Sequence, residues 1–384
     1  MNVRADLYKW QYLTRQWLAG QYSRLKYFPT RGRKEQEGQE PERVLLIATG
    51  LIGDTVMSTP VILEARRLWP EAKITLLGRK HNCELLSACP LLDSCIEAPA
   101  IPFSIRKRRE IAALKERVRE ERFDLAIILL GDQFALMLAE VGIPVRVGVR
   151  GHLLEPCLTH TYDIRSPREW GPAERLNALR CLGYDVRDVR PQLWVSDDAR
   201  DAVWRKLADW GLTRGEDYAL IHPFGSEMRK WWSVDKVGEL AVKLRQEWGL
   251  RTVLVGGSET RDFVPEHVRV RVIDTTGRLS LQELAAAIDQ ARVVISTDSG
   301  PYHIAGALAR PIVGLFPSLR PEHANRYPEA RIVFGHDASC QHSCKWDYCQ
   351  SQHCRQLTAI SVVGVVSAVG WVGLRLYAGS GARQ

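Results

Sequence analysis

Two series of short apolar runs, each alternating with helical stretches, constrain the fold more than any other feature of this sequence. In the first series, which begins at Arg43, the expected strands and helices are Val44–Ala48, Thr55–Leu68, Ile74–Leu77, Glu110–Glu121 and Asp124–Leu130. After a helical stretch around Asp198–Trp210, the second series has expected strands at Tyr218–His222, Thr252–Val255, Val293–Ser296 and Ile312–Leu315. Strands that alternate with helices form parallel sheets covered on both faces. The sequence therefore predicts an α/β fold with two doubly wound, Rossmann-like units.

The length of 384 residues also favours two domains, because a single hydrophobic core stops growing below this size. We expect an extension and linker at 1–42, an N-terminal domain at 43–200, a C-terminal domain at 201–356, and a closing helix and tail at 357–384. Residues 357–374 carry no charge. This length reaches the lower limit for a membrane-spanning helix, so a span is the alternative to a closing helix.

The N-terminal extension differs in charge from the rest of the chain. Residues 1–34 hold eight Lys or Arg and a single acid, Asp6, and apolar residues recur at helical spacing from Leu7 to Leu25. A basic, aromatic-rich amphipathic helix is typical of a segment that lies in a membrane interface, and docking on the protein itself or on a second subunit is the alternative. The first thirty residues contain no apolar run of the signal-peptide type, which predicts a cytoplasmic protein with mostly reduced cysteines. The formal net charge of +8 favours acidic partners, such as anionic lipids and phosphorylated sugars.

The first chemical motif, Ala48–Thr55, joins an expected strand to an expected helix and contains Gly50, Gly53 and Asp54. Ligands of parallel sheets bind at this carboxyl edge, and glycine lets them approach the backbone closely. The motif is not GxGxxG, which argues against a nicotinamide cofactor. Asp54 is either a functional carboxylate or an acid that the start of a helix favours.

Two further motifs lie at the ends of strands in the second series. The segment Ile221–Ser226 is followed by Lys230, which provides backbone amides, a hydroxyl and a cation for a phosphate group. The segment Ser296–His303 leads into a helix of small residues, where free amides attract anions. A serine nucleophile at Ser299 is disfavoured because the nucleophile-elbow pattern is absent.

Four cysteines gather in one short segment near the end of the chain: Cys340, Cys344, Cys349 and Cys354. They have enough thiolates for a structural zinc or iron site, although no CxxC spacing occurs among them. Packing is the alternative. We expect the five other cysteines to be packing residues.

Three ordered motifs closely resemble those of the lipopolysaccharide heptosyltransferase family, glycosyltransferase family 9. They are Leu51–Asp54 with Thr59-Pro60, Thr275–Gly277 before Ser280–Leu284, and Asp298–His303. The resemblance runs from about Arg43 to the C-terminal helix. It implies a GT-B fold, with an acceptor domain, a donor domain and a cleft between them, and inverting transfer from ADP-heptose without a catalytic metal or other required cofactor.

The resemblance also assigns roles, with Asp54 as the catalytic base. The implied donor-binding residues are Gly225, Ser226, Lys230, Thr276, Gly277, Asp298, Ser299, Gly300 and His303. The residues expected to bind a phosphorylated glycolipid acceptor are Gly53, Arg79, Lys80, Arg106 and Arg109, and a solvated helix face is the alternative for the basic run at 106–109. Trp232 and Gly171 depart from the family pattern, and we expect both to lie near substrate surfaces.

The predicted function is therefore transfer of a heptose to a hydroxyl of a lipopolysaccharide core or a similar membrane-borne glycan. We expect a cytoplasmic enzyme at the inner-membrane surface, with no nucleic-acid partner. A sugar-nucleotide epimerase of GT-B type and a non-catalytic membrane scaffold are the alternatives.

Overall fold

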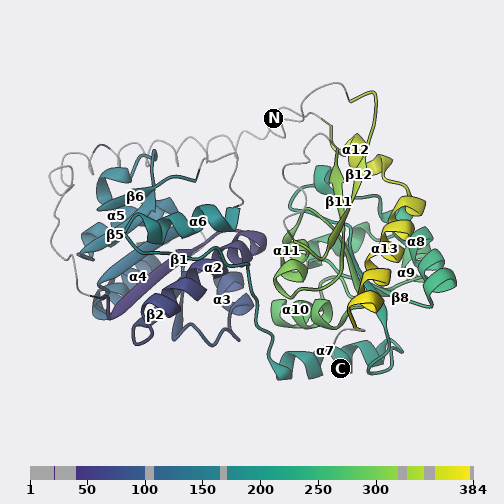
Figure 1. Cartoon of the computed structure of the whole chain (residues 1–384), viewed down its shortest axis with the longest axis horizontal. Coiled ribbons are helices and arrows are strands. Elements are labelled where there is room, and N and C mark those ends of the chain that lie inside the picture. Colours follow the sequence, from purple (N-terminus) through teal and green to yellow (C-terminus); the bar gives the residue numbers. More distant parts are fainter. Residues whose placement is uncertain are drawn as a thin grey trace. The chain divides into compact units, whose positions relative to one another are not determined.

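The computed structural model divides the chain into two compact units, residues 1–192 and residues 193–384 (Figure 1). It describes residue 21 and residues 40–99, 108–164, 171–318, 327–340 and 351–380, with the backbone alone at 108 and 373–380. Most of the basic N-terminal extension predicted from the sequence lies outside these residues. Each unit has its own parallel sheet, as the alternation of apolar runs and helices predicts.

The first unit is built on a six-stranded parallel sheet with the order β3-β2-β1-β4-β5-β6. Its strands are β1 Arg43–Ala48, β2 Lys73–Gly78, β3 Ser94–Glu97, β4 Leu125–Leu130, β5 Val145–Val149 and β6 His160–Tyr162. Its helices are α2 Ile52–Leu68, α3 Lys80–Leu85, α4 Arg108–Glu120, α5 Ala135–Glu140 and α6 Gly171–Arg180, with single turns η3 Asp132–Phe134 and η4 Glu155–Cys157. The first strand thus lies at the centre, which is the order of a Rossmann unit.

The central strands of this unit are apolar because helices cover both of their faces. Five of the six residues of β1 are buried, and its register pairs Leu45 with Thr75 of β2 and with Ala126 of β4. Leu45, Ile47 and Ile128 belong to one buried cluster that also contains residues of α4 and α5. On these strands, the predicted bounds agree with the structure to within one residue.

The second unit repeats the strand order of the first, as β12-β11-β10-β7-β8-β9. Its strands are β7 Tyr218–His222, β8 Arg251–Leu254, β9 Ile273–Asp274, β10 Val293–Thr297, β11 Ile312–Pro317 and β12 Ala330–Gly335. Its helices and turns are α7 Asp197–Asp209, η5 Met228–Lys230, α8 Val234–Trp248, η6 Ser258–Phe263, α9 Glu266–Arg269, α10 Leu281–Gln290, α11 Gly300–Ala307, α12 Arg355–Ala359 and α13 Val362–Ser380. Local sequence signals set several helix ends: Ser280 and Glu283 form a capping box at the start of α10, and Gly249 ends α8 at a φ of 68°.

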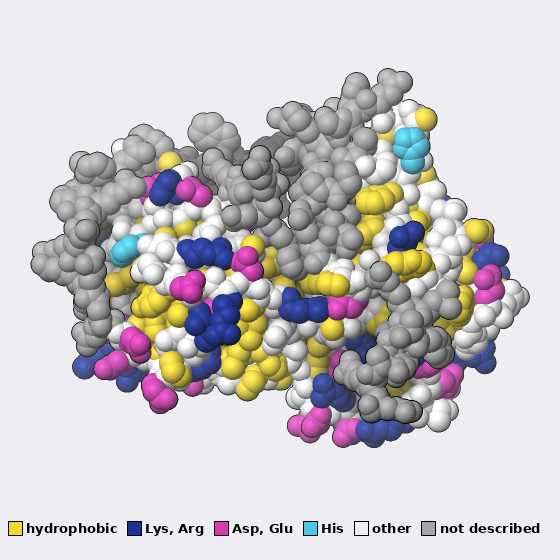
Figure 2. Space-filling view, viewed as in Figure 1, with side chains coloured by type: hydrophobic (Ala, Val, Ile, Leu, Met, Phe, Trp, Pro, Cys, Tyr) yellow, Lys and Arg dark blue, Asp and Glu magenta, His cyan; other side chains and the backbone are white. Residues whose placement is uncertain are grey.

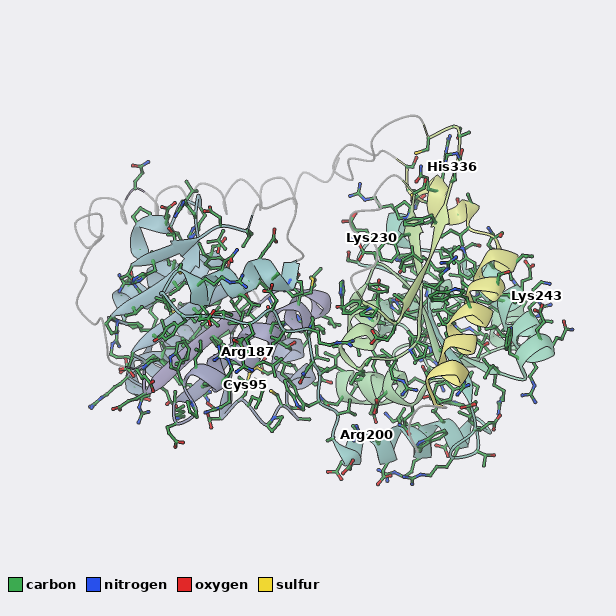
Figure 3. The ribbon with its side chains drawn as sticks, in the orientation of Figure 1. Cys95, Arg187, Arg200, Lys230, Lys243 and His336 are labelled. Carbon is green, nitrogen blue, oxygen red and sulfur yellow. A yellow bond between two sulfur atoms is a disulfide. The ribbon has the colours of Figure 1, made fainter. Side chains whose placement is uncertain are left out.

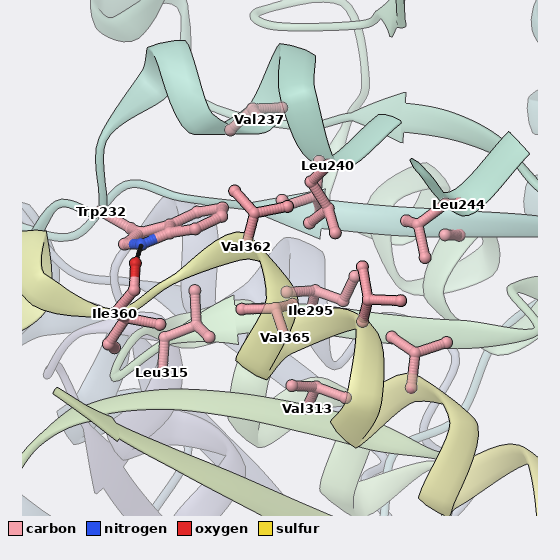
Figure 4. Close-up of a cluster of buried hydrophobic side chains, with 14 of the residues drawn as sticks. Trp232, Val237, Leu240, Leu244, Ile295, Val313, Leu315, Ile360, Val362 and Val365 are labelled. Carbon is pink, nitrogen blue, oxygen red and sulfur yellow. Dashed lines mark hydrogen bonds between the residues drawn. The ribbon is translucent and has the colours of Figure 1, made fainter. Parts of the chain in front are cut away.

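The last helix, α13, closes the core of the second unit. Val362 and Val365 are buried with Leu240 of α8 and Ile295 of β10 in one cluster (Figure 4). Among the residues that the structure describes, no helix is long and apolar enough to cross a bilayer.

Trp232 belongs to the same cluster, so its side chain lies in the core and not on a surface. Its side chain is 1 % exposed, and its indole nitrogen donates a hydrogen bond of 3.2 Å to the carbonyl of Ile360 (Figure 4). The residue therefore joins the turn before α8 to the segment that leads into α13.

A disulfide in the first unit corrects one expectation. Cys83 of α3 and Cys95 of β3 are bonded to each other, with their Cα atoms 5.9 Å apart, whereas the sequence suggested reduced packing residues (Figure 3). Helix α3 packs against β2 and β3, and the turn between α3 and β3 brings the two cysteines together. Of the other three cysteines in this unit, Cys89 and Cys157 are buried and Cys181 is half-buried, and none of the three forms a disulfide.

Charges of both signs are interspersed on the face of the molecule seen in Figure 2. Among the described residues, ion pairs at partly exposed positions include Arg66 with Asp93 at 2.6 Å and Arg180 with Asp188 at 2.6 Å. Such pairs add little stability individually. The concentrated excess of positive charge belongs instead to residues 1–34, as the sequence shows.

Candidate active site

Both units present polar loops at the place where a Rossmann strand order reverses direction. This switch point lies between β1 and β4 in the first unit and between β7 and β10 in the second. In open α/β sheets, ligands bind at the carboxyl ends of the strands on either side of this point. The motifs that contain Asp54, Gly225 and Ser299 follow β1, β7 and β10 respectively, so all three lie at such carboxyl ends.

In the first unit, Asp54 stands in the first turn of α2, and both of its carboxylate oxygens are bonded. Oδ2 accepts a hydrogen bond of 3.2 Å from the backbone N–H of Leu51, which caps the helix. Oδ1 accepts one of 3.0 Å from Nη2 of Arg175, whose Nη1 also donates to the backbone carbonyl of Asp54 at 2.6 Å. The Asp54 side chain is 31 % exposed and that of Arg175 only 9 %, so the carboxylate remains open to a ligand while the guanidinium does not.

Arg175 was not among the predicted site residues. It lies in α6, 121 residues from Asp54, and no local pattern links the two positions. Burial lowers the pKa of Arg175, while Asp54 and Tyr162 act in the opposite direction. A guanidinium remains protonated in proteins, so the pair combines a fixed buried cation with a partly exposed carboxylate. Gly171, which also departs from the family pattern, begins this helix, and a side chain there would meet Met57 of α2.

The loop before Asp54 is held by the start of α3. The Gly50 carbonyl accepts a hydrogen bond of 3.1 Å from Nδ2 of Asn82 and lies 2.9 Å from Nε2 of His81. Asn82 also donates to Oγ1 of Thr55 at 2.5 Å, and its own Oδ1 accepts from the Arg79 N–H at 2.7 Å. Asn82 is fully buried.

Two of the predicted acceptor residues line one cavity of the first unit. Arg79 and Lys80 border a space of about 600 Å³ together with His81, Arg117 and apolar residues of β3 and α4. Glu97 and Glu110 also line it, so the wall is basic but not exclusively so. Arg109 is exposed and does not line the cavity, Gly53 is buried in α2, and Arg106 lies outside the described residues.

In the second unit, the two switch-point loops are bonded to each other. Ser296 of β10 pairs with His222 of β7, and Nδ1 of His222 lies 3.0 Å from the hydroxyl of Ser299. Thr297 donates a hydrogen bond to the carbonyl of Phe224. Burial lowers the pKa of His222 to about 4, so this histidine is neutral at neutral pH. His222 was not assigned as a site residue, although it directly precedes the predicted Pro223–Ser226 turn.

The backbone of Gly225 lies close to the side chain of Lys230. A Cβ on Gly225 would lie 2.5 Å from the Cβ of Lys230, so only glycine leaves room for this lysine. The carbonyl of Gly225 accepts a hydrogen bond of 3.0 Å from the indole of Trp231, while Ser226 is exposed. Lys230 lies in η5, directly after this turn (Figure 3).

The other predicted donor residues occupy the same carboxyl edge of the second sheet. Thr276 follows β9 and bonds Asp274 through its amide and hydroxyl, and Gly277 has a φ of 69° and donates to the Gly256 carbonyl at 2.9 Å. A Cβ on Gly277 would lie 2.7 Å from the Cα of Ser258, so the loop after β8 packs against the loop after β9. Gly256 was not predicted, although a Gly-Gly pair after a strand is a signal that could have identified it.

The segment Asp298–His303 is stabilised by Tyr327, which lies just before β12. Nδ1 of His303 lies 3.0 Å from the hydroxyl of Tyr327, and its Nε2 is 3.9 Å from the Asp298 carboxylate. Ser299 is the N-cap of α11 and Gly300 its first residue, so free backbone amides stand at this point. These contacts give the loop the geometry of an anion-binding helix start.

Only part of the predicted cysteine site can be placed. Cys344 and Cys349 lie outside the described residues, whereas Cys340 is a half-buried free thiol and Cys354 is buried at the N-cap of α12. In the part of the chain that the structure describes, no three His, Cys, Asp or Glu side chains are grouped so that they could hold a metal ion.

Solved structures define the class of this fold. Escherichia coli ADP-heptose lipopolysaccharide heptosyltransferase II superposes with a TM-score of 0.70 at 21 % identity, covering 87 % of this chain and 99 % of its own. E. coli heptosyltransferase WaaC with ADP-2-deoxy-2-fluoro heptose superposes with a TM-score of 0.62 at 18 % identity, covering 86 % and 99 %. The protein accordingly has a two-domain α/β GT-B fold.

Sequence comparison gives the family. The model of glycosyltransferase family 9 (heptosyltransferase) matches residues 111–353. Lipopolysaccharide heptosyltransferase 3 of E. coli K12 is 28 % identical over 281 residues, which is 69 % of this chain and 79 % of the relative. The chain belongs to glycosyltransferase family 9, and it is a glycosyltransferase, as its motifs predicted.

Proposed function

We propose that this enzyme transfers a heptose from ADP-heptose to a hydroxyl of a lipopolysaccharide core or a similar membrane-borne glycan, with inversion at the anomeric carbon. Asp54 takes the proton of the acceptor hydroxyl as its oxygen attacks the anomeric carbon. The bond from that carbon to the diphosphate breaks as the new bond forms, and ADP leaves with that bonding electron pair. The proposal draws its donor and acceptor from the relatives, whose names specify ADP-heptose and lipopolysaccharide.

The observation that carries the proposal is the environment of Asp54. A general base needs a carboxylate that reaches the substrate and is held in one orientation. Asp54 is at a switch point and 31 % exposed, while the Leu51 amide and the buried Arg175 guanidinium fix its two oxygens. A carboxylate that only capped α2 would not require a buried guanidinium on its second oxygen.

The proposed donor site lies in the second unit. Lys230 supplies a cation, and the start of α11 at Ser299 and Gly300 supplies backbone amides for the diphosphate. Such groups neutralise the charge that develops on a leaving diphosphate without a catalytic metal. Gly225, Ser226, Thr276, Gly277, Asp298 and His303 complete the proposed donor loops.

The proposed acceptor site lies in the first unit, at the cavity lined by Arg79 and Lys80. Two cations on a wall next to the loop that contains Asp54 fit an acceptor bearing phosphate or carboxylate groups. Because the proposed acceptor, a lipopolysaccharide core or a similar glycan, is membrane-borne, the enzyme works at the cytoplasmic surface of the inner membrane. Arg106 and Arg109 remain proposed outer contacts of this site.

The decisive variant is Asp54→Asn, which keeps the shape of the side chain and removes the base. We expect kcat to fall by about 10²-fold or more, with ADP affinity by calorimetry and the unfolding temperature close to wild type. The matched control is Asp132→Asn, which changes another acid at the same edge, two residues after β4, and it should leave kcat close to wild type. If Asp54→Asn turned over at the wild-type rate with saturating donor and acceptor, Asp54 would serve only as a helix cap.

A further inference from the structure

We propose that Asn82 is a positioning residue for the reaction, acting on Asp54 through the peptide unit that joins Gly50 to Leu51. This inference rests on the proposed role of Asp54 as base. Asn82 is in α3, and its side-chain hydrogen bonds join it to Arg79, Gly50 and Thr55 and not to the side chain of Asp54. Its influence therefore has to pass through the backbone.

The orientation of the Asn82 amide is unambiguous. The Gly50 carbonyl can only accept a hydrogen bond, and the Arg79 N–H can only donate one. The nitrogen of the amide must therefore face Gly50, and its oxygen must face Arg79. By the same argument, Nε2 of His81, 2.9 Å from the Gly50 carbonyl, carries the proton. Two donors from the start of α3 thus converge on one carbonyl oxygen.

That carbonyl oxygen shares a peptide plane with the group that caps the base. The C=O of Gly50 and the N–H of Leu51 belong to one planar trans peptide unit, so fixing the direction of the oxygen also fixes the direction of the N–H. The Leu51 N–H donates to Oδ2 of Asp54 at 3.2 Å. Hydrogen bonds in such a chain also polarise one another. Asn82, the peptide unit and Asp54 therefore form one chain of hydrogen bonds.

The second hydrogen bond of Asn82 fixes the other end of the loop. Nδ2 donates to Oγ1 of Thr55, and that hydroxyl donates to the carbonyl of Leu51 at 3.0 Å. Leu51 is consequently held at both its N–H and its C=O, although its side chain is 59 % exposed. The loop has little room to relax around Asp54, because a Cβ on Gly50 would already lie 2.8 Å from the Cβ of Asp54.

The same residue connects the base to the proposed acceptor cavity. Asn82 Oδ1 holds the N–H of Arg79, and the side chains of Arg79 and His81 line the cavity. A change at Asn82 therefore moves the base relative to an acceptor bound there, while the donor residues belong to the other unit. We expect the effect on kcat to exceed any effect on the KM for the donor.

A double-mutant cycle with Asp54 tests the inference. Asn82→Ala in the wild-type background should lower kcat about tenfold, since small displacements of a reacting group are costly, with the donor KM unchanged. In the Asp54→Asn background the same change should lower kcat by less than about twofold, because residues that act through one another are not additive. His81→Ala removes the other donor from the same carbonyl at a half-exposed position, and it serves in place of Asn82→Ala if that variant fails to fold.

Thr75→Val is the matched control for stability. Thr75 is buried in the same unit, and its hydroxyl is hydrogen-bonded to that of Ser94 at 2.9 Å, so Thr75→Val should lower the unfolding temperature and leave kcat unchanged. Wild-type kcat in Asn82→Ala, or an equal loss in both backgrounds, overturns the inference alone. Wild-type kcat in Asp54→Asn overturns the proposed function, and this inference with it.

Discussion

Arg175 and Arg180 lie in the same helix, yet their environments differ so much that their replacement has different consequences. Arg175 is nearly buried and donates to both the side chain and the backbone of Asp54, whereas Arg180 pairs with the exposed Asp188 at the surface. Removing one partner of a buried ion pair leaves a desolvated charge, whereas surface pairs contribute little.

We therefore expect Arg175→Met to lower the free energy of unfolding by about 2 kcal/mol, a value reduced from that of a fully buried pair because the Asp54 carboxylate is partly exposed. It should also lower kcat more than tenfold by releasing the base. Arg180→Met, the matched control, should change stability by less than about 0.5 kcal/mol and leave kcat unchanged. Urea unfolding and steady-state kinetics measure both effects, and equal behaviour of the two variants would contradict the assigned role of Arg175.

His222 makes the stability of the second unit depend on pH. Burial lowers its pKa from 6.5 to about 4, so as the pH falls the unfolded chain binds a proton before the folded protein does. The contribution is fully present above about pH 6.5 and is lost as the pH falls toward 4. Between pH 7 and pH 5, the free energy of unfolding of the wild type should therefore fall by about 2 kcal/mol more than that of His222→Gln. Urea unfolding at both pH values tests this, with the exposed His267→Gln as a control that should retain the wild-type difference.

At the scale of elements, the disulfide ties α3 to β3 on two sides of the proposed acceptor cavity. Cys83 follows His81 and Asn82, and Cys95 precedes Ile96 and Glu97, which line that cavity. A bridge over 12 residues restricts the unfolded chain, which stabilises the folded unit by about 3 kcal/mol in the loop-entropy model.

We expect the variant with both Cys83→Ser and Cys95→Ser to show this loss in urea unfolding. Cys181→Ser, which removes a half-buried free thiol of the same unit, should show a much smaller one. Peptide mapping of the non-reduced protein checks the bond directly. Recovery of Cys83 and Cys95 only as separate alkylated peptides would show that the protein is made without it.

The strands that sequence analysis located are those whose apolar runs are long and buried on both faces, such as β1, β7 and β10. The unpredicted strands β3, β5, β6, β9 and β12 lie at or next to the edges of the two sheets, and β6 and β9 have only three and two residues. Motifs identified the loops at the carboxyl edges, because glycine and polar residues after a strand are local signals. Arg175 could not be assigned in this way, since its partner is 121 positions away and only the folded chain brings them together.

At the scale of the whole molecule, the charge is divided unevenly along the chain. With eight Lys or Arg and one acid, residues 1–34 contribute seven of the formal net charge of +8. We expect the full chain to float with anionic liposomes at low salt and to be released at high salt, because salt screens such contacts. A variant lacking residues 1–34 should float much less, and neutral liposomes serve as the control. Equal flotation of the two forms would place the membrane contact elsewhere.

The position of α13 also determines the order in which the two units can be completed during translation. All strands and helices of the first unit lie before residue 193, so its core can form while the ribosome is still reading the second half. The second sheet is different, because Val362, Val365 and Val369 come from a helix that follows every one of its strands in the chain. The nascent second unit therefore exposes an incomplete core until α13 has emerged from the ribosome.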